Sequence, residues 1–218
     1  MTSRTAFEEF KLRFNRLDTN FSADMSSFKF CALFNKAQFM YIDKLLMQEE
    51  ANKETQSNLQ TLLVDVMVSG VNYQNIYEVN LPDDWYWIKR LEVQDTKCKN
   101  ILNCLLVQES NIGRLLQDEN WRPDVEWEET IFTLGADKAR VYVDNFQVSK
   151  PRIIYYRTPV LIDIQSGVNN IYGNLSKNVD PEWIDAITQQ IIDLAVIIAA
   201  SDIGDAQLFQ SKAQLLKK

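Results

Sequence analysis

The chain has 218 residues, of which 46% are hydrophobic and 24% charged, and it contains no histidine. This composition excludes a disordered or fibrous chain, and the length suffices for one large domain or two small ones. The net charge of −7 argues against non-specific binding to nucleic acid or to an anionic membrane, because that binding depends on lysine and arginine.

Two amphipathic helices are predicted first. Apolar side chains recur at helical spacing from Phe7 to Phe21, and Thr5 with Glu8 has the form of a capping box. The second helix begins at Ser26 or Ser27 and carries a broad apolar stripe, which predicts neighbours on two sides. The polar stretch that follows, residues 48–58, is either a loop or a solvated extension of this helix.

Beyond this stretch the apolar residues alternate with period two, which predicts β-strands. Two runs of apolar residues at odd-numbered positions follow, and the members of each run would share one face of the sheet. The first run comprises Val71, Tyr73, Tyr77, Val79 and Leu81, and the second comprises Trp85, Trp87, Leu91 and Val93. Pro82-Asp83-Asp84 between the runs has the composition of a turn. We therefore expect a hairpin or a sheet corner there.

Further strands are expected over residues 101–107, 130–134, 140–143 and 152–164. Short strands with short gaps favour antiparallel pairing. The connection from Glu109 to Glu129 is long and polar for a hairpin loop, which makes it a candidate arm toward a neighbouring subunit. Trp121 and Trp127 lie on this connection and are candidate interface residues.

Asp180-Pro181-Glu182 predicts the start of a last helix, with aspartate at the N-cap and proline in the first turn. That helix is apolar on most sides, so it is either central to its own domain or packed between its domain and another subunit. Ile192 and Ile197 are candidate interface residues for the second arrangement. After Gly204 the apolar pattern continues to the basic end Lys217-Lys218, which suits a helix C-terminus.

Together these elements predict an α+β fold. N- and C-terminal helices, in residues 1–63 and 180–218, would form a helical frame around a central, mainly antiparallel β segment in residues 64–179. We expect the two parts to make one composite domain.

The sequence offers few groups for chemistry. Without histidine, Ser-His-Asp and Cys-His nucleophiles, HExxH zinc sites and imidazole acid–base catalysis are excluded. The six glycines form neither GxGxxG nor a P-loop, and the acidic clusters lack EF-hand spacing. The three cysteines form no CxxC pair and fit a reducing cytosol. We therefore expect no catalytic, cofactor-binding or metal-binding residues, and no enzyme.

The aromatic cluster Trp85-Tyr86-Trp87 has three interpretations. On a regular strand the two tryptophans would face the core and Tyr86 the outside. A subunit contact through Trp85 and Tyr86 is the second interpretation. Stacking on a nucleic acid or a sugar, with Lys89-Arg90 adding positive charge, is the third, and the acidic chain argues against it.

Three segments resemble virion proteins of crAss-like phages. They are FNKAQFMYIDKLL (Phe34 to Leu46), RIIYYRTPVLIDI (Arg152 to Ile164) and DPEWIDAITQQIIDLAVIIAASDIGDAQLF (Asp180 to Phe209). PDDWYWI, residues 82–88, is in addition similar to a corner found in many tailed-phage connector proteins. With this fourth segment the resemblance covers most of the chain.

The resemblance implies a head-tail connector in the virion neck, a portal adaptor or stopper assembled in the host cytoplasm. Such a protein would form a ring of about twelve identical copies. Its faces would hold the portal protein and other neck or tail proteins, and DNA would pass its lumen without sequence-specific binding. No membrane contact is expected.

The residues are compatible with this picture, because a ring needs two different adhesive faces on each subunit and an acidic lumen repels phosphates. The alternatives are another virion role, such as tail hub or assembly factor, a monomeric protein-binding module, and an unrecognised carboxylate enzyme.

Overall fold

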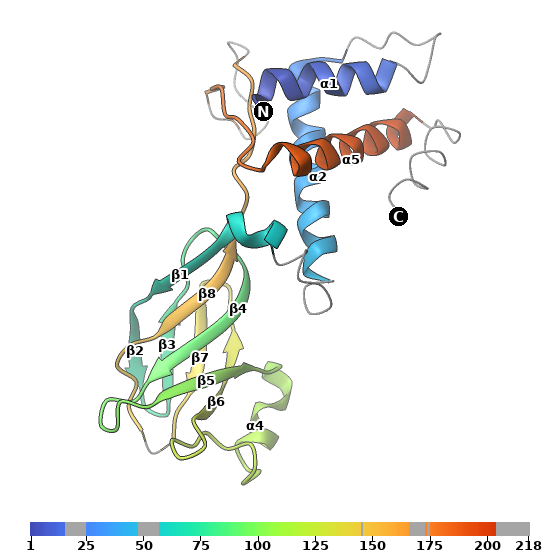
Figure 1. The fold of residues 1–218 in the computed structure, drawn as a ribbon. Helices are drawn as coiled ribbons and strands as arrows, with labels where there is room; N and C mark the ends of the chain where they lie inside the picture. Colours follow the sequence, from blue (N-terminus) through green and yellow to red (C-terminus); the bar gives the residue numbers. More distant parts are fainter. Residues whose placement is uncertain (16–24, 48–56, 145, 166–172, 174, 204–218) are drawn as a thin grey trace. The chain divides into compact units, whose positions relative to one another are not determined.

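The computed structural model describes residues 1–15, 25–47, 57–144, 146–165, 173 and 175–203. The chain divides into two compact units. The helical unit comprises Met1–Thr61 and Pro159–Lys218, and the β unit comprises Leu62–Thr158. The predicted α+β class is confirmed, since helices from both ends of the chain form one unit and the central segment forms the other (Figure 1). The boundaries between the two units follow residues 61 and 158, whereas the boundaries predicted from the sequence follow residues 63 and 179.

The helical unit contains α1 (Ser3–Asn15), α2 (Ser27–Leu46) and α5 (Asp185–Ile203). Both α1 and α2 pack on α5, and α2 also contacts α1. Ser26 caps α2, since its hydroxyl accepts a hydrogen bond from the Lys29 N–H at 3.2 Å. The expected continuation of the first helix to Phe21 and the pattern after Gly204 lie outside the described residues.

The first helix begins earlier than the capping-box pattern predicted. Thr2 is its N-cap, because the Thr2 Oγ1 accepts from the Thr5 N–H at 3.2 Å. The carboxylate of Asp180 accepts from the N–H of Ser3 at 2.7 Å and so satisfies a second free amide of α1. Asp180 therefore caps a helix, but a different one from the helix that follows it in sequence.

The last helix begins at Asp185, so the predicted start at Asp180 is wrong. The residues between are held by tertiary hydrogen bonds: Glu182 Oε1 accepts from the Val160 N–H at 2.8 Å, and Trp183 Nε1 donates to Gln38 Oε1 at 2.9 Å. These bonds hold the segment outside the helix, which begins at Asp185.

The β unit is one curled sheet of eight strands, in the order β1-β8-β4-β5-β6-β7-β3-β2. The strands are β1 (Leu63–Met67), β2 (Gly70–Tyr73), β3 (Ile76–Asn80), β4 (Trp85–Gln94), β5 (Ile101–Leu106), β6 (Glu129–Leu134), β7 (Lys138–Tyr142) and β8 (Arg152–Arg157). Every neighbouring pair is antiparallel except β5 and β6. The prediction of a mainly antiparallel segment is confirmed. The short helices η2 (Glu109–Asn111) and α4 (Ile112–Leu115) accompany it, and η1 (Gln60–Leu62) spans the boundary at residues 61 and 62.

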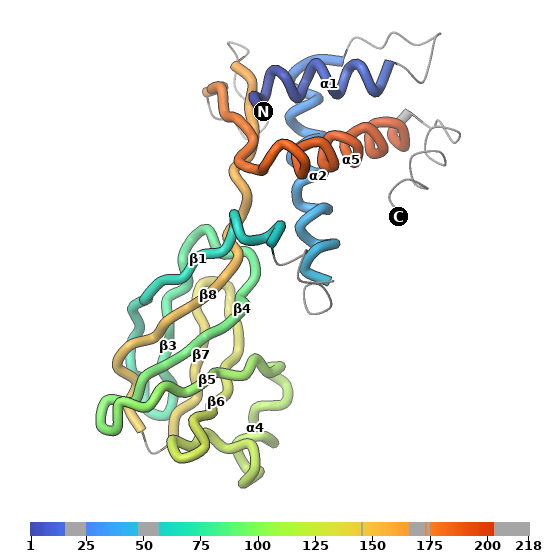
Figure 2. The backbone as a smooth tube through the Cα atoms, in the orientation of Figure 1, coloured from blue at the N-terminus to red at the C-terminus, as the bar shows by residue number. Residues whose placement is uncertain are grey.

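The sheet closes on itself through one stretch of chain. Its two edge strands, β1 and β2, are separated only by Val68 and Ser69, and the path can be followed in Figure 2. The Val68 N–H donates to the Pro151 carbonyl at 3.0 Å, and Ser69 accepts from the Asn80 N–H at 2.9 Å. Residues 63–73 therefore pair with β8 at one end and with β3 at the other.

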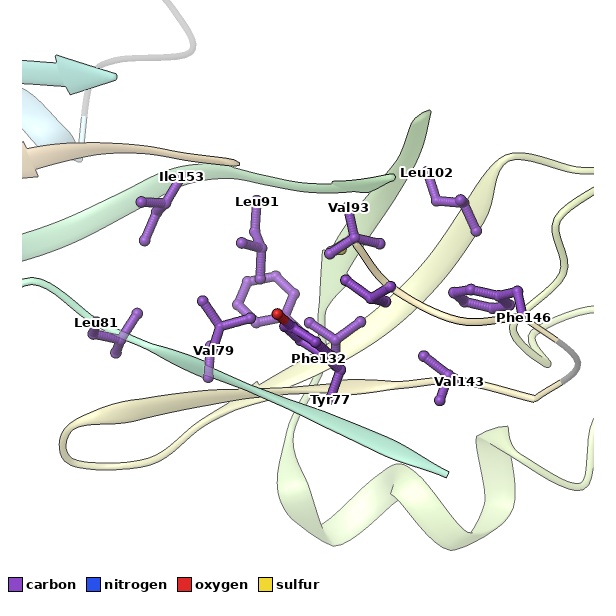
Figure 3. Packing of buried hydrophobic residues seen from close by; sticks show 14 of the residues in the cluster. Tyr77, Val79, Leu81, Leu91, Val93, Leu102, Phe132, Val143, Phe146 and Ile153 are labelled. Carbon is purple, nitrogen blue, oxygen red and sulfur yellow. The ribbon is translucent and has the colours of Figure 1, made fainter. Parts of the chain in front are cut away.

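The core of the β unit fills the inside of this curl. Side chains from β3, β4, β5, β6, β7 and β8 converge there, together with Phe146 and Val148 (Figure 3). Val79, Leu91, Val93, Leu102 and Ile153 have no exposed surface. Burial of this size is the main favourable term in folding a domain of this kind.

The predicted strand over residues 152–164 ends at Arg157. Thr158 precedes a proline, and beyond Pro159 the chain belongs to the helical unit. There the side chains of Asn35 and Gln38 on α2 bind the backbone of Ile162 and Val160.

Candidate interaction surfaces

Two of the predicted interface residues lie together. Trp121 and Trp127 line one hollow of about 360 Å³, with Leu105 and Ile131 of the sheet beneath them. The side chains are 49% and 79% exposed. Large aromatic side chains left this open are typical of sites that partners cover.

The parallel pairing of β5 and β6 explains why these tryptophans lie outside the sheet. A parallel pair needs a long crossover connection, and residues 107–128 supply it. The connection is pinned to the β unit, since Pro123 is buried, Val125 packs against the core and the Arg122 Nε lies 3.2 Å from Asp144 Oδ2. The candidate arm is thus a folded part of the β unit.

Trp121 also borders a second hollow of about 580 Å³. This hollow is lined by Leu105, Leu106, Val107, Gln108, Asn111, Arg114, Leu115 and Asp118 in addition to Trp121. We call the exposed set Leu105, Leu106, Trp121 and Trp127 the tryptophan surface. Leu105 and Trp121 line both hollows.

The connection that carries the two tryptophans is acidic, and Glu119 and Glu129 line the first hollow. Residues 108–129 carry seven acidic side chains against two arginines, a net charge of 2 − 7 = −5. Three glutamates, Glu119, Glu126 and Glu128, are exposed and form no ion pair with another described residue. One of the arginines, Arg122, is already paired with Asp144.

A second exposed apolar surface follows the segment that closes the sheet. We call it the closing-strand surface; its side chains are Leu63, Met67, Val71 and Tyr73, between 39% and 69% exposed. Asp65 is the one charged side chain in residues 63–73. It is held by Arg152 of β8, whose Nε donates to Asp65 Oδ1 at 2.8 Å.

The two surfaces lie on opposite sides of the β unit. In the closed strand order, the β5-β6 pair is as far as possible from the junction of β1 with β2. Figure 1 shows β5, β6 and α4 on the side of the sheet away from β1 and β2.

The prediction that Val71 and Tyr73 face the same side of the sheet as Tyr77 and Val79 is wrong. The hairpin between β2 and β3 explains why. Tyr73 pairs with Ile76 across a two-residue turn, so odd-numbered residues of β2 lie opposite even-numbered residues of β3. Val71 and Tyr73 therefore face outward while Tyr77 and Val79 face the core. Counting across the Gln74-Asn75 turn would have revealed this in the sequence.

Trp87 also faces outward, which corrects its placement in the core beside Trp85. The pairing of β4 with β8 shifts register between Trp85 and Trp87 and again between Ile88 and Arg90. Each irregularity reverses the facing of the residues that follow. Trp85 and Ile88 thus pack against the core, Tyr86 is half-buried, and Trp87 is 51% exposed.

Ile192 and Ile197 are buried in the helical unit, 0% and 8% exposed. The described structure leaves them almost no surface for a partner, in contrast to their prediction as interface residues. The physical reason is that α5 is packed by both α1 and α2, so most of its sides face this chain's own side chains. Of the two interpretations given for this helix, the structure therefore favours a position central to its own domain.

Leu105 and Leu106 were missed as candidates. Leu102 and Cys104 of β5 face the core, whereas Ile101 and Leu105 are exposed. The sequence of this strand is apolar on both faces. Because one face of a strand in an antiparallel sheet normally meets water, this pattern could have indicated an apolar outer surface.

A row of charges crosses the outside of β1, β8 and β4. Arg152 contacts Asp65 and, at 3.5 Å, Glu92 Oε2, and Glu92 also pairs with Arg90 at 2.7 Å. The hydrogen bonds from Arg152 hold the pKa of Asp65 below its ordinary value. Glu92 is only 7% exposed, so the two arginines compensate a nearly buried carboxylate.

Asp95 fastens the turn after β4. Its carboxylate accepts from the backbone N–H groups of Lys97 and Cys98 at 3.0 and 2.6 Å, and from that of Gln147 at 3.3 Å. These hydrogen bonds, that of Cys98 above all, lower the pKa of Asp95. Its partners are all backbone groups, which makes it a structural residue.

Burial raises the pKa of the Cys31 thiol to about 11 and raises that of Cys104 as well. Among the described residues, no three histidine, cysteine or acidic side chains gather in a way that could hold a metal ion. No described helix combines the length and the apolarity needed to cross a membrane.

The chain matches no family model, and no curated protein matches its sequence. The candidate site is therefore defined by the two exposed surfaces alone.

Proposed function

We propose that this chain is a structural subunit of a tailed-phage virion, a neck ring protein that joins the portal to the tail and lets DNA pass. The observation that carries the proposal is the placement of two different apolar surfaces on opposite sides of one compact β unit. A neck ring subunit contacts its neighbours in the ring as well as the portal, so each copy needs more than one adhesive surface.

The resemblance to crAss-like phage virion proteins agrees with this proposal. Its segments are also the ones that hold the helical unit together: Asn35 and Gln38 of the NKAQ segment bind Ile162 and Trp183 of the other two. The net charge of −7 supports passage of DNA without binding, because an acidic lining repels phosphates.

The test is to mix the purified chain with the portal protein of the same virus and image the mixture by negative stain. Closed rings seated on the portal are the expected result. Tyr73→Ser and Trp127→Ser, which change one apolar surface each, should each reduce ring formation. Lys150→Ser, an exposed position of the same unit outside both surfaces, is the matched control.

A monomeric protein-binding module is the second candidate, and the tryptophan surface favours it because one apolar site suffices for a single partner. The two functions differ in the Tyr73→Ser variant. A binding module with its site at Trp127 would keep its affinity in that variant, whereas a ring subunit would lose assembly with either substitution.

A further inference from the structure

The tryptophan surface is acidic and apolar at the same time, and its occupant must match both properties. An apolar side chain is needed to cover Trp121 and Trp127, and basic side chains are needed for the glutamates around them. A covering segment without positive charge would take Glu119 and Glu129 out of water beside Arg122, which is already paired with Asp144.

The closing-strand surface of a second copy does not meet this requirement. Residues 63–73 contain no lysine or arginine, and their one charged side chain is Asp65. Such a contact would cover the tryptophans but would leave the surrounding acids without a partner.

The carboxyl-terminal segment meets both requirements. Residues 204–218, which lie outside the described residues, read GDAQLFQSKAQLLKK. They carry three lysines and one aspartate, a net side-chain charge of 3 − 1 = +2, together with two apolar pairs, Leu208-Phe209 and Leu215-Leu216. The two hollows that Trp121 lines offer two places for apolar side chains.

We propose that residues 204–218 of one copy bind the tryptophan surface of the next copy. Leucine and phenylalanine side chains enter the hollows that Trp121 lines, and lysines lie against Glu119 and Glu129 of the first hollow. This inference rests on the proposed ring, because it names one of the head-to-tail contacts that a ring requires.

Crosslinking between full-length chains tests the contact. In a Cys98→Ser background, which removes the exposed native thiol, Asn120→Cys marks the rim of the hollow and Gln214→Cys marks the segment. The two variants carry different tags, are mixed with portal protein and are treated with a short bis-maleimide. Lys150→Cys replaces Asn120→Cys in the matched control, since Lys150 is exposed and lines neither hollow.

The expected result is a mixed product at least about tenfold more abundant with Asn120→Cys than with Lys150→Cys, consistent with a specific contact. Replacing Lys212, Lys217 and Lys218 by glutamate should lower this product at least about fivefold, because three ion pairs become repulsions. Raising the salt to about 0.5 M should also lower it, because salt screens charges at the surface.

Equal products from the two positions would overturn the inference. A third variant carries both Asn120→Cys and Gln214→Cys in one chain. A crosslink within that chain, without the mixed product between chains, would also overturn the inference, because the segment would then cover its own chain. Rings on the portal without the mixed product would overturn this contact and leave the proposed function standing. The mixed product without rings or portal binding would have the opposite meaning, a true contact in a protein that is not a neck ring.

Discussion

The side-chain amide of Asn35 pairs with the backbone of Ile162 in both directions. The Asn35 Nδ2 donates to the Ile162 carbonyl at 3.1 Å, and the Asn35 Oδ1 accepts from the Ile162 N–H at 2.9 Å. Asn35 is 1% exposed, so the pair is closed to water. A side chain of α2 thus takes the place of a strand partner for the segment that returns from the β unit.

Asn35→Leu should therefore destabilise the protein strongly. The substitution leaves a buried N–H and a buried carbonyl of Ile162 without partners, at a cost of about 3 kcal/mol in the free energy of unfolding. Chemical denaturation measures it. Lys36→Leu, at the neighbouring exposed position, should change that free energy by less than about 0.5 kcal/mol. Equal effects of the two substitutions would show that the amide bonds are unimportant.

Tyr155→Phe should alter the response of stability to alkaline pH. Burial, and after it the hydrogen bond from the Tyr155 hydroxyl to Asp84 at 2.8 Å, raises the pKa of Tyr155 to about 12. An unfolded tyrosine loses its proton near pH 10, so between about pH 10 and 12 the folded state binds more protons and stability falls as pH rises.

Urea denaturation of both proteins at several pH values above 9 measures this dependence. The wild type should lose stability more steeply than the Tyr155→Phe variant, which has no proton to lose there. Parallel curves would contradict the raised pKa. Near neutral pH the variant should be weaker by about 1 kcal/mol, the typical value of one hydrogen bond.

Arg152→Gln should return the pKa of Asp65 to its ordinary value, because the hydrogen bonds from Arg152 are the main cause of its lowering. The pair of Asp65 and Arg152 contributes to folding stability at pH values above the ordinary pKa of aspartate. This contribution is lost as the pH falls through the lowered pKa of Asp65. Carboxyl NMR titration of the two proteins measures the shift. An unchanged Asp65 titration would contradict the assignment, and Lys150→Gln is the control for a general change of charge.

Cys98 should be the thiol that reacts in the folded protein. Cys98 is exposed, whereas Cys31 and Cys104 are buried with raised pKa values. Brief treatment with a maleimide at neutral pH, followed by peptide mass spectrometry, should find the label on Cys98. Label on all three thiols should require denaturant, and rapid labelling of Cys104 without it would contradict the packing of the β unit.

Trp127→Ser and Trp183→Ser should differ strongly in their effect on the free energy of unfolding. Trp127 is 79% exposed, so its loss should change the free energy of unfolding by less than about 0.5 kcal/mol. Trp183 is 3% exposed and packs edge-on against Tyr41, so its loss should cost about 3 to 5 kcal/mol. Thermal melting compares the two, and a large destabilisation by Trp127→Ser would mean that Trp127 is a core residue.

The sequence by itself determined the local features of this protein. Helix α2 and its Ser26 cap, strands β4 to β7 and the turn at Pro82-Asp83-Asp84 follow from spacing and residue type, because periodicity and capping act over a few residues. Trp121 and Trp127 could be chosen in advance because both lie on a polar connection that is long for a hairpin loop.

The tertiary structure decided the features that depend on partners distant in sequence. Asp180 caps α1 rather than its own helix, the two register shifts in β4 turn Trp87 outward, and packing by α1 and α2 buries Ile192. The placement of the two apolar surfaces on opposite sides of the β unit was also decided by the tertiary structure, because it arises only when residues 63–73 close the sheet. Hydrogen bonds and burial between distant segments fix these arrangements, and a pattern of neighbouring residues carries no information about them.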